Sequence, residues 1–321
     1  MNLKAEPLAS PRVRGDVESP QQRATEMVAQ IILARKIGER LPNVGELRVT
    51  IGVGAGTIQK ALQELQNDNL VVLASKQRQG TFIVEKNPGG LWTMAGFHPL
   101  SVIMPLPLSW EFQGLATGLR AALDQYAIPS SFIFGHGSTQ RSKALSDALC
   151  HIAVMSTHAA KKIIAAKPAF FIHTTYAAGS YYADDSVIVV ARAPREHLPR
   201  NLRVGIDRLS IDHAMLTQLE FPDNTYVDVS YAHIPAALIS GACDVAVWHS
   251  SAFGLSLNHQ ELVTWPLSAS AMALLTNEMF SASLVIDKSN TITRAVLDDI
   301  DIAQVEKIQR EVVEGKRLPT Y

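Results

Sequence analysis

The chain has 321 residues, of which 47% are hydrophobic and 18% are charged, and its formal net charge is −1. This length exceeds one average domain, so two or three domains are expected, and the apolar fraction excludes a wholly disordered chain. Residues 1–90 carry 12 basic and 9 acidic side chains, whereas the remaining residues carry 17 basic and 21 acidic ones. By itself, this small basic excess near the N-terminus attracts phosphate groups only weakly.

The cysteines and the lack of a long apolar run bear on the cellular compartment. Cys150 and Cys243 lie far apart in apolar contexts without metal-ligand spacing, which favours buried thiols in a reducing compartment. No stretch of 18 apolar residues occurs, and residues 1–22 are rich in proline, serine and charged residues without an apolar signal segment. The sequence therefore predicts a cytoplasmic protein with no membrane partner, and a disordered leader over residues 1–22.

Residues 23–87 begin with two helices. Apolar residues recur at helical spacing from Arg23 until Gly38, which predicts the first helix. The Leu41-Pro42 pair then breaks the pattern, and Asn43 is placed to cap a short helix that ends near Thr50.

The next segments complete the pattern of a winged helix-turn-helix. Gly52 and Gly54 predict a tight turn, and residues 57–66 are expected to form a helix with one apolar face. Two β-rich runs follow at 70–73 and 81–84, joined by a polar turn with a basic tip. This hairpin is the expected wing, so residues 23–87 are predicted to form a DNA-binding domain.

In such a domain the second helix of the motif enters the major groove, while turn and wing groups contact phosphates. Double-stranded DNA is therefore the expected partner. The alternative is that these positions are ordinary solvated polar residues. The candidate DNA-binding residues are Arg48, Thr57, Gln59, Lys60, Arg78, Gln79 and Gly80.

After a predicted linker over residues 88–97, strands and helices alternate through residues 98–321. The alternation indicates α/β layers with a parallel sheet. A β-rich middle part separates two such patterns, which predicts two lobes that close about a hinge. Lobe I is expected at about 98–170 and 265–321, and lobe II at about 193–262.

Ligands of open α/β sheets bind beyond the carboxyl ends of the strands, near helix N-termini. Hydroxyls there, together with Arg141, suit a carboxylate or phosphate, and Asp207 suits an amine. Several of the hydroxyls could instead be simple helix N-caps, and Trp248 could pack at the rim. The candidate effector-binding residues are Pro107, Ser109, Ser138, Thr139, Arg141, Ser156, Thr157, Asp207, Ser210 and Trp248.

Two resemblances to known families extend these predictions. Residues 41–84 resemble the DNA-binding domain of GntR-family regulators. Gly45, Ala55, Gln59 and Lys60 stand where that family usually places other residues, arginines above all. The matching residues are Leu41, Pro42, Glu46, Leu47, Gly52, Val53, Thr57, Ala61, Leu62, Gly80, Thr81 and Phe82.

From the helix-turn-helix to the C-terminus, the chain resembles the YhfZ family. That resemblance implies an α+β winged helix-turn-helix domain followed by a bilobal α/β domain of the type II periplasmic-binding-protein-like fold, and it brings no known ligand. The residues that carry it are Met104, Pro105, Leu106, Pro107, Glu111, Gly114, Leu115, Ala116, Gly118, Leu119, Gly205, Asp207, Asp228, Ser230, Tyr231, Asp244 and Trp248.

The sequence favours a homodimeric transcription regulator that responds to a small polar or anionic effector. No catalytic signature, metal-ligand spacing or cofactor motif occurs, so we expect no catalytic residues, no metal and no cofactor. The alternative is a small-molecule-binding protein or an enzyme on the same fold. In that case the degenerate helix-turn-helix would serve dimerisation and would not bind DNA.

Overall fold

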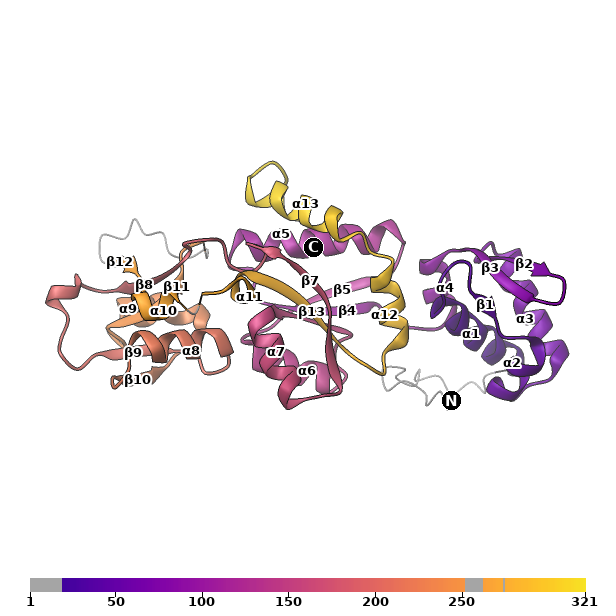
Figure 1. Cartoon of the computed structure of the whole chain (residues 1–321), viewed down its shortest axis with the longest axis horizontal. Coiled ribbons are helices and arrows are strands. Elements are labelled where there is room, and N and C mark those ends of the chain that lie inside the picture. Colours follow the sequence, from indigo (N-terminus) through magenta and orange to yellow (C-terminus); the bar gives the residue numbers. More distant parts are fainter. Residues whose placement is uncertain (1–18, 252–261, 274) are drawn as a thin grey trace. The chain divides into compact units, whose positions relative to one another are not determined.

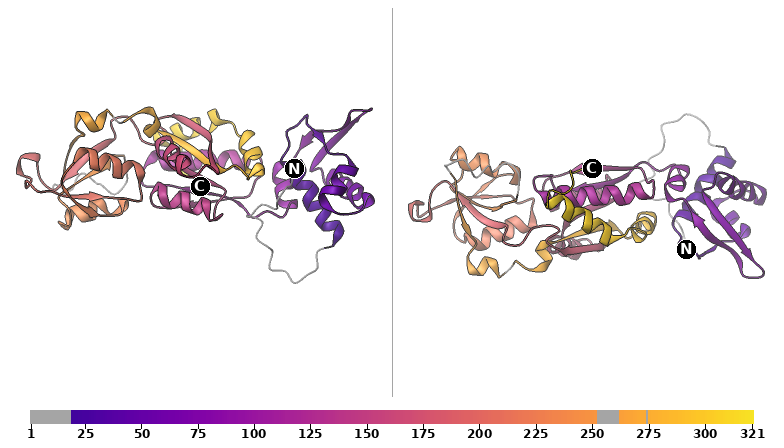
Figure 2. Two further views of the ribbon diagram at one scale, coloured as in Figure 1. Left: turned by 60° about the horizontal axis from the view of Figure 1, so that its bottom comes forward. Right: turned by 90° about the horizontal axis from the view of Figure 1, so that it is seen from above.

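The computed structural model describes residues 19–251, 262–273 and 275–321, and the chain divides into two compact units (Figures 1 and 2). The first unit comprises the residues up to Leu100 together with 121–131 and 289–301, and the second comprises 101–120, 132–288 and 302–321. Most of the expected leader, residues 1–18, lies outside the described residues. Its last residues, from Pro20, already belong to the first helix.

The first unit contains the winged helix-turn-helix. Its helices are α1 (Pro20–Leu33), α2 (Val44–Ile51) and α3 (Ala55–Asn67), and its strands are β1 (Arg40–Leu41), β2 (Val71–Lys76) and β3 (Gly80–Lys86). The strands form an antiparallel sheet in the order β1-β3-β2. The predicted cap is confirmed: Asn43 accepts from the Glu46 amide at 2.9 Å, and Glu46 accepts from the Asn43 amide at 2.7 Å.

The expected linker is instead a helix, α4 (Pro88–Met94). Asn87 caps it, and Leu91 and Trp92 are buried, so this segment adds to the core. The Pro-Gly-Gly composition misled the sequence analysis. Gly89 serves close packing, because a Cβ there would lie 2.1 Å from the Ala127 carbonyl oxygen.

The segment 289–301 also belongs to the first unit and carries α12 (Thr291–Asp298). Lys86, whose side chain is only 4% exposed, lies 3.3 Å from an Asp299 carboxylate oxygen and donates to the Arg35 carbonyl at 2.8 Å. The Tyr126 hydroxyl donates to the Asp299 carbonyl at 2.6 Å. Residues distant in sequence are thus joined at the end of α1.

The second unit is built around two five-stranded sheets. The first has the order β5-β4-β6-β13-β7 and the second has the order β10-β9-β11-β8-β12. The strands of the first are β4 (Leu100–Met104), β5 (Ser130–Phe134), β6 (Ile152–Ser156), β7 (Phe170–Ala178) and β13 (Ser281–Asp287). Those of the second are β8 (Val187–Ala191), β9 (Arg203–Ile206), β10 (Thr225–Asp228), β11 (Val245–His249) and β12 (Val263–Pro266).

Both sheets are mixed, so the expectation of a parallel sheet was wrong. β4 pairs with β6 in parallel, and β9 pairs with β10 and β11 in parallel. However, β13 runs antiparallel to β6 and β7, and β8 runs antiparallel to β11 and β12. The chain passes between the sheets twice, from β7 to β8 and from β12 to β13, and these passages supply the antiparallel strands.

Helices cover both faces of each sheet. On the first sheet, α5 (Trp110–Gln125) and α13 (Ile302–Val313) lie on one side, while α6 (Ser138–Ser146) and α7 (Thr157–Ala166) lie on the other (Figure 1). On the second, α8 (Ile211–Glu220) and α9 (Ile234–Ile239) take opposite faces, and the short α10 (Ala269–Met272) packs with α8. The alternation of side chains along β11 explains why helices cover both faces of the second sheet. Val245 and Val247 join the α8 core, whereas Ala246 and Trp248 join the α9 core.

Two glycines of α5 allow the close approach of α13. A Cβ on Gly118 would lie 2.6 Å from the Val305 carbonyl oxygen, and one on Gly114 would lie 2.8 Å from the Gln309 carbonyl oxygen. Since backbone cannot move aside as a side chain can, these two helices must separate if either glycine gains a methyl group.

We expect Gly118→Ala to lower the free energy of unfolding by roughly 1–3 kcal/mol, because it overpacks the α5–α13 contact. The matched control is Gly56→Ala in α3, where an added Cβ meets nothing within 4 Å. The control should gain about 0.5–1 kcal/mol from alanine's helix propensity. Urea unfolding of both variants measures the difference. Equal stabilities would contradict the packing argument.

Candidate functional site

The helix-turn-helix presents most of its predicted DNA-contact residues to solvent. Arg48, Gln59 and Lys60 are exposed, and Thr57 is half-buried. The N-cap of α3 is Gly54, which offers no side-chain hydrogen bond, so the first amide groups of this helix stay open to an acceptor. Exposed polar side chains next to an uncapped helix N-terminus form a surface that can meet DNA bases and phosphates.

The wing adds two exposed polar side chains at its tip. Arg78 and Gln79 are exposed, and Arg78 has a φ of +59°. Gly80 follows with a φ of +105°, and a Cβ there would lie 2.7 Å from Arg40 Nε. Arg40 was missed by the sequence analysis. It precedes the Leu-Pro motif and reaches the wing only because β1 pairs with β3.

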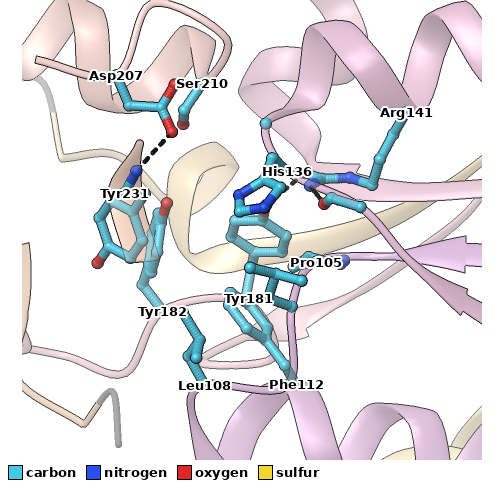
Figure 3. Close-up of a pocket in the computed structure, with 13 residues that line it drawn as sticks. Pro105, Leu108, Phe112, His136, Arg141, Tyr181, Tyr182, Asp207, Ser210 and Tyr231 are labelled. Atoms are coloured by element: carbon cyan, nitrogen blue, oxygen red, sulfur yellow. Dashed lines mark hydrogen bonds between the residues drawn. The ribbon is translucent and has the colours of Figure 1, made fainter. Parts of the chain in front are cut away.

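A pocket lies between the two sheets of the second unit (Figure 3). Its free volume is about 50 Å³, which holds only a few water molecules at ~10–15 Å³ each. Both lobes contribute to its wall. The lining residues are Pro105, Leu106, Leu108, Phe112, Gly135, His136, Gly137, Arg141, Tyr181, Tyr182, Asp207, Ser210 and Tyr231.

Arg141 and Asp207, both predicted, line this pocket from opposite lobes and are each 3% exposed. Arg141 donates to the Val154 carbonyl at 2.8 Å, the Gly135 carbonyl at 3.0 Å and the Tyr181 hydroxyl at 3.0 Å. These bonds fix the guanidinium at the carboxyl ends of β5 and β6.

The Asp207 carboxylate accepts from two backbone amides, that of Leu209 and that of Tyr231, both at 2.9 Å. It therefore holds the loop before α8 and the start of the 3₁₀ turn Tyr231–His233. Ser210, the third predicted residue in the wall, caps α8 by accepting from the His213 amide.

Three other predicted residues lie where the lobes touch, not in the pocket wall. The Ile211 amide donates to Ser138 Oγ at 3.2 Å, and the Thr139 amide donates to the Leu209 carbonyl at 3.0 Å. Ser156 caps α7, and its hydroxyl donates to Asp212 Oδ2 at 2.6 Å. The polar groups of these three residues therefore form hydrogen bonds between the lobes.

The remaining predicted residues are bonded or packed elsewhere. Ser109 is fully buried and accepts from the Phe112 amide, and the Pro107 carbonyl accepts from Gln113. The Thr157 hydroxyl donates to the Ser281 carbonyl. Trp248 stacks on Tyr231, with ring centroids 4.5 Å apart, so it supports a wall residue from behind.

Four aromatic residues of the wall were missed. Phe112 lies 5.0 Å from Tyr181 and 6.4 Å from Tyr182 between ring centroids, and Tyr231 lies next to Tyr182 (Figure 3). Tyr181 and Tyr182 lie on the passage from β7 to β8. The adjacent tyrosines were a signal, but the rule that nominates strand ends does not reach them.

Burial shifts three titratable groups near the lobe contact. It raises the pKa of Asp212, which the Ser156 hydroxyl only partly offsets, and Asp212 Oδ1 has no hydrogen-bond partner among the described residues. Burial also lowers the pKa of His213, and it lowers the pKa of His249 to about 4 despite the nearby Glu111. All three groups therefore resist ionisation in the folded state.

The described residues hold neither a cluster of metal ligands nor a helix that could cross a membrane. No group of three or more His, Cys, Asp or Glu side chains is placed to hold a metal ion there. No helix in those ranges is both long and apolar enough to cross a membrane.

Comparisons with known proteins cover both units. The family model of the YhfZ C-terminal domain matches residues 89–321, and that of the bacterial regulatory proteins of the gntR family matches residues 20–83. The uncharacterized protein YhfZ of Escherichia coli K12 is 27% identical over 298 residues, which cover 92% of this chain and 95% of that protein.

Solved structures are similar as well. The crystal structure of YhfZ from Shigella flexneri has a TM-score of 0.54 at 23% identity, covering 69% of this chain and 93% of that one. The periplasmic aliphatic sulphonate binding protein SsuA of Escherichia coli has a TM-score of 0.49 at 11% identity, covering 68% and 74%. The predicted architecture, a winged helix-turn-helix followed by a bilobal α/β domain, is confirmed by the two family models and the two sheets of the second unit.

The depressed pKa of His249 gives a testable pH dependence. An unfolded histidine takes up a proton near pH 6.5, but His249 in the folded state does so only near pH 4. Stability from this group is therefore present above pH 6.5 and is lost as the pH falls toward 4, by up to about 3 kcal/mol.

Urea unfolding between pH 7 and pH 4 measures this effect, with His249→Gln as the comparison. Other groups, Asp212 included, titrate in both proteins, so the difference between the two pH curves isolates His249. We expect the variant's stability to fall less steeply with decreasing pH. Parallel curves would show that His249 protonates freely in the folded protein.

Proposed function

The chain belongs to the YhfZ family, and on that premise we propose that it is a ligand-responsive transcription regulator. Its GntR-type domain binds double-stranded DNA, and its bilobal unit binds a small polar metabolite. The observation that carries the proposal is the pairing, in one chain, of an exposed recognition-helix face with a pocket between two lobes that contains Arg141 and Asp207. We assign it no enzymatic activity and place it in the cytoplasm, where its DNA would be.

Contacts across the pocket support a two-state lobe movement. The lobes are joined by polar contacts such as Ser156–Asp212 and Ser138–Ile211, and by a few apolar ones, since Ile211 packs against the core of the first sheet and Leu108 against that of the second. The free volume of about 50 Å³ is far below the roughly 300–1,000 Å³ of typical ligand pockets. A bound metabolite therefore selects a wider cleft than the one in this structure.

We propose that this choice between narrow and wide clefts sets the affinity for DNA. In a homodimer, two winged helices must meet half-sites about one helical turn apart, so a small change in their separation alters binding. The usual coupling between sites, about 1–3 kcal/mol, corresponds to a change of roughly 5–150-fold in DNA affinity.

The proposal predicts that two cationic side chains contact DNA phosphates and that Gln59 contacts a base. Lys60→Ala and Arg78→Ala should weaken binding to all sequences, and each should reduce the slope of log affinity against log salt by about 1. Gln59→Ala should lose about 1–3 kcal/mol on the preferred duplex only, because Gln59 would contact a base edge.

Fluorescence anisotropy measures these effects with the duplex upstream of the protein's own gene and a shuffled duplex of equal length. The control is Lys162→Ala, which removes an exposed lysine of α7 and should leave both affinities unchanged. The comparison is made between about 50 and 200 mM salt, the range over which affinity from phosphate contacts falls steeply. If the unaltered protein does not distinguish the two duplexes there, the helix-turn-helix is degenerate and serves assembly.

A further inference from the structure

The pocket between the lobes contains two buried charges of opposite sign. Arg141 and Asp207 line it from opposite lobes, at 3% exposure each, and neither forms an ion pair with another described residue. The buried Asp212 interacts electrostatically with Arg141 but forms no ion pair with it. Because burying a charge without a close counter-charge is costly, the Arg141 and Asp207 charges within one pocket indicate a ligand that supplies a counter-charge to each.

The arginine retains hydrogen-bonding capacity. A guanidinium has five N–H groups. Arg141 uses three of them, on two carbonyls and the Tyr181 hydroxyl. The other two can bind a carboxylate, because Arg141 has no carboxylate partner within ion-pair distance among the described residues.

The opposite wall suits a cation. The Asp207 carboxylate has about four acceptor positions, of which the Leu209 and Tyr231 amides use two. Beside it lie the rings of Tyr182 and Tyr231, and the rings of Phe112 and Tyr181 continue the wall (Figure 3). Aromatic faces attract cations, most strongly where water is excluded.

We infer that this pocket takes a zwitterion, with its carboxylate toward Arg141 and its cationic nitrogen toward Asp207 and the tyrosine rings. Free amino acids and betaines have this chemistry. A dianion such as phosphate or a dicarboxylate would meet Asp207 without compensation, and a simple amine would leave Arg141 unpaired. The inference rests on the ligand-binding half of the proposed function and defines the effector more narrowly than polar or anionic.

The experiment is a ligand panel on the unaltered full-length protein without DNA. Thermal shift identifies hits among the L- and D-amino acids and glycine betaine. Calorimetry then compares each hit with its decarboxylated amine and its deaminated acid. We expect a zwitterion hit, and at least about tenfold weaker binding for both matched compounds, since each lacks one charged contact.

Two results of the panel would overturn the inference. One is that inorganic phosphate or a dicarboxylate stabilises the protein as much as any zwitterion. The other is that no zwitterion shifts the melting temperature. Because DNA is absent from these measurements, loss of DNA binding in the anisotropy experiment would leave the inference intact. Conversely, normal DNA binding with no zwitterion bound would reject the inference alone.

A variant pair tests the aromatic wall. Tyr182→Phe keeps the ring, and Tyr182→Leu removes it. For the zwitterion found in the panel, we expect affinity within about twofold of the unaltered protein in the first variant and a loss of about fivefold or more in the second. The melting temperatures without ligand report whether both variants fold. Equal affinities of the two folded variants would exclude a cation bound against this ring.

Discussion

The bilobal unit depends on one backbone-to-backbone contact between its lobes. Gly137 has a φ of +55°, and a Cβ there would lie 2.3 Å from the Leu209 carbonyl oxygen. The same carbonyl accepts from the Thr139 amide at 3.0 Å. Any side chain at position 137 would hold the lobes apart, and the pocket wall, which needs residues from both loops, would not assemble.

Other contacts join the lobes around this backbone approach. They include the Ser156–Asp212 hydrogen bond, the 3.1 Å contact of Ser230 with His136 and the packing of Ile211 against the core of the first sheet. Asp212 has lost solvent and still lacks a partner for one oxygen, which raises its pKa and offsets part of what closure gains. Closure of the lobes therefore carries an electrostatic cost at Asp212 beside the contacts that it gains.

The sequence specified local structure better than tertiary relations. The Asn43 capping box could be predicted because its partners are three residues apart, and the helices followed from their apolar spacing. The direction of the strands could not be predicted from the sequence, because the antiparallel course of β8 and β13 is set by the passages between the two sheets. Helix α4 was missed because proline and glycine are common both in loops and at close contacts. In this segment, burial of Trp92 in the core stabilises the helix.

The predicted effector-binding residues coincide only partly with the pocket wall, for a related reason. The strand-end rule found Arg141 and Asp207, yet Ser156 caps a helix and bonds across the lobes, because a buried hydroxyl satisfies the nearest backbone or side-chain partner first. Tyr181 and Tyr182 were missed because they lie on the passage between β7 and β8. That position has a mechanical consequence. Since this passage connects the two sheets, it must bend if the lobes separate, so a ligand bound against these rings as we propose would act on the hinge.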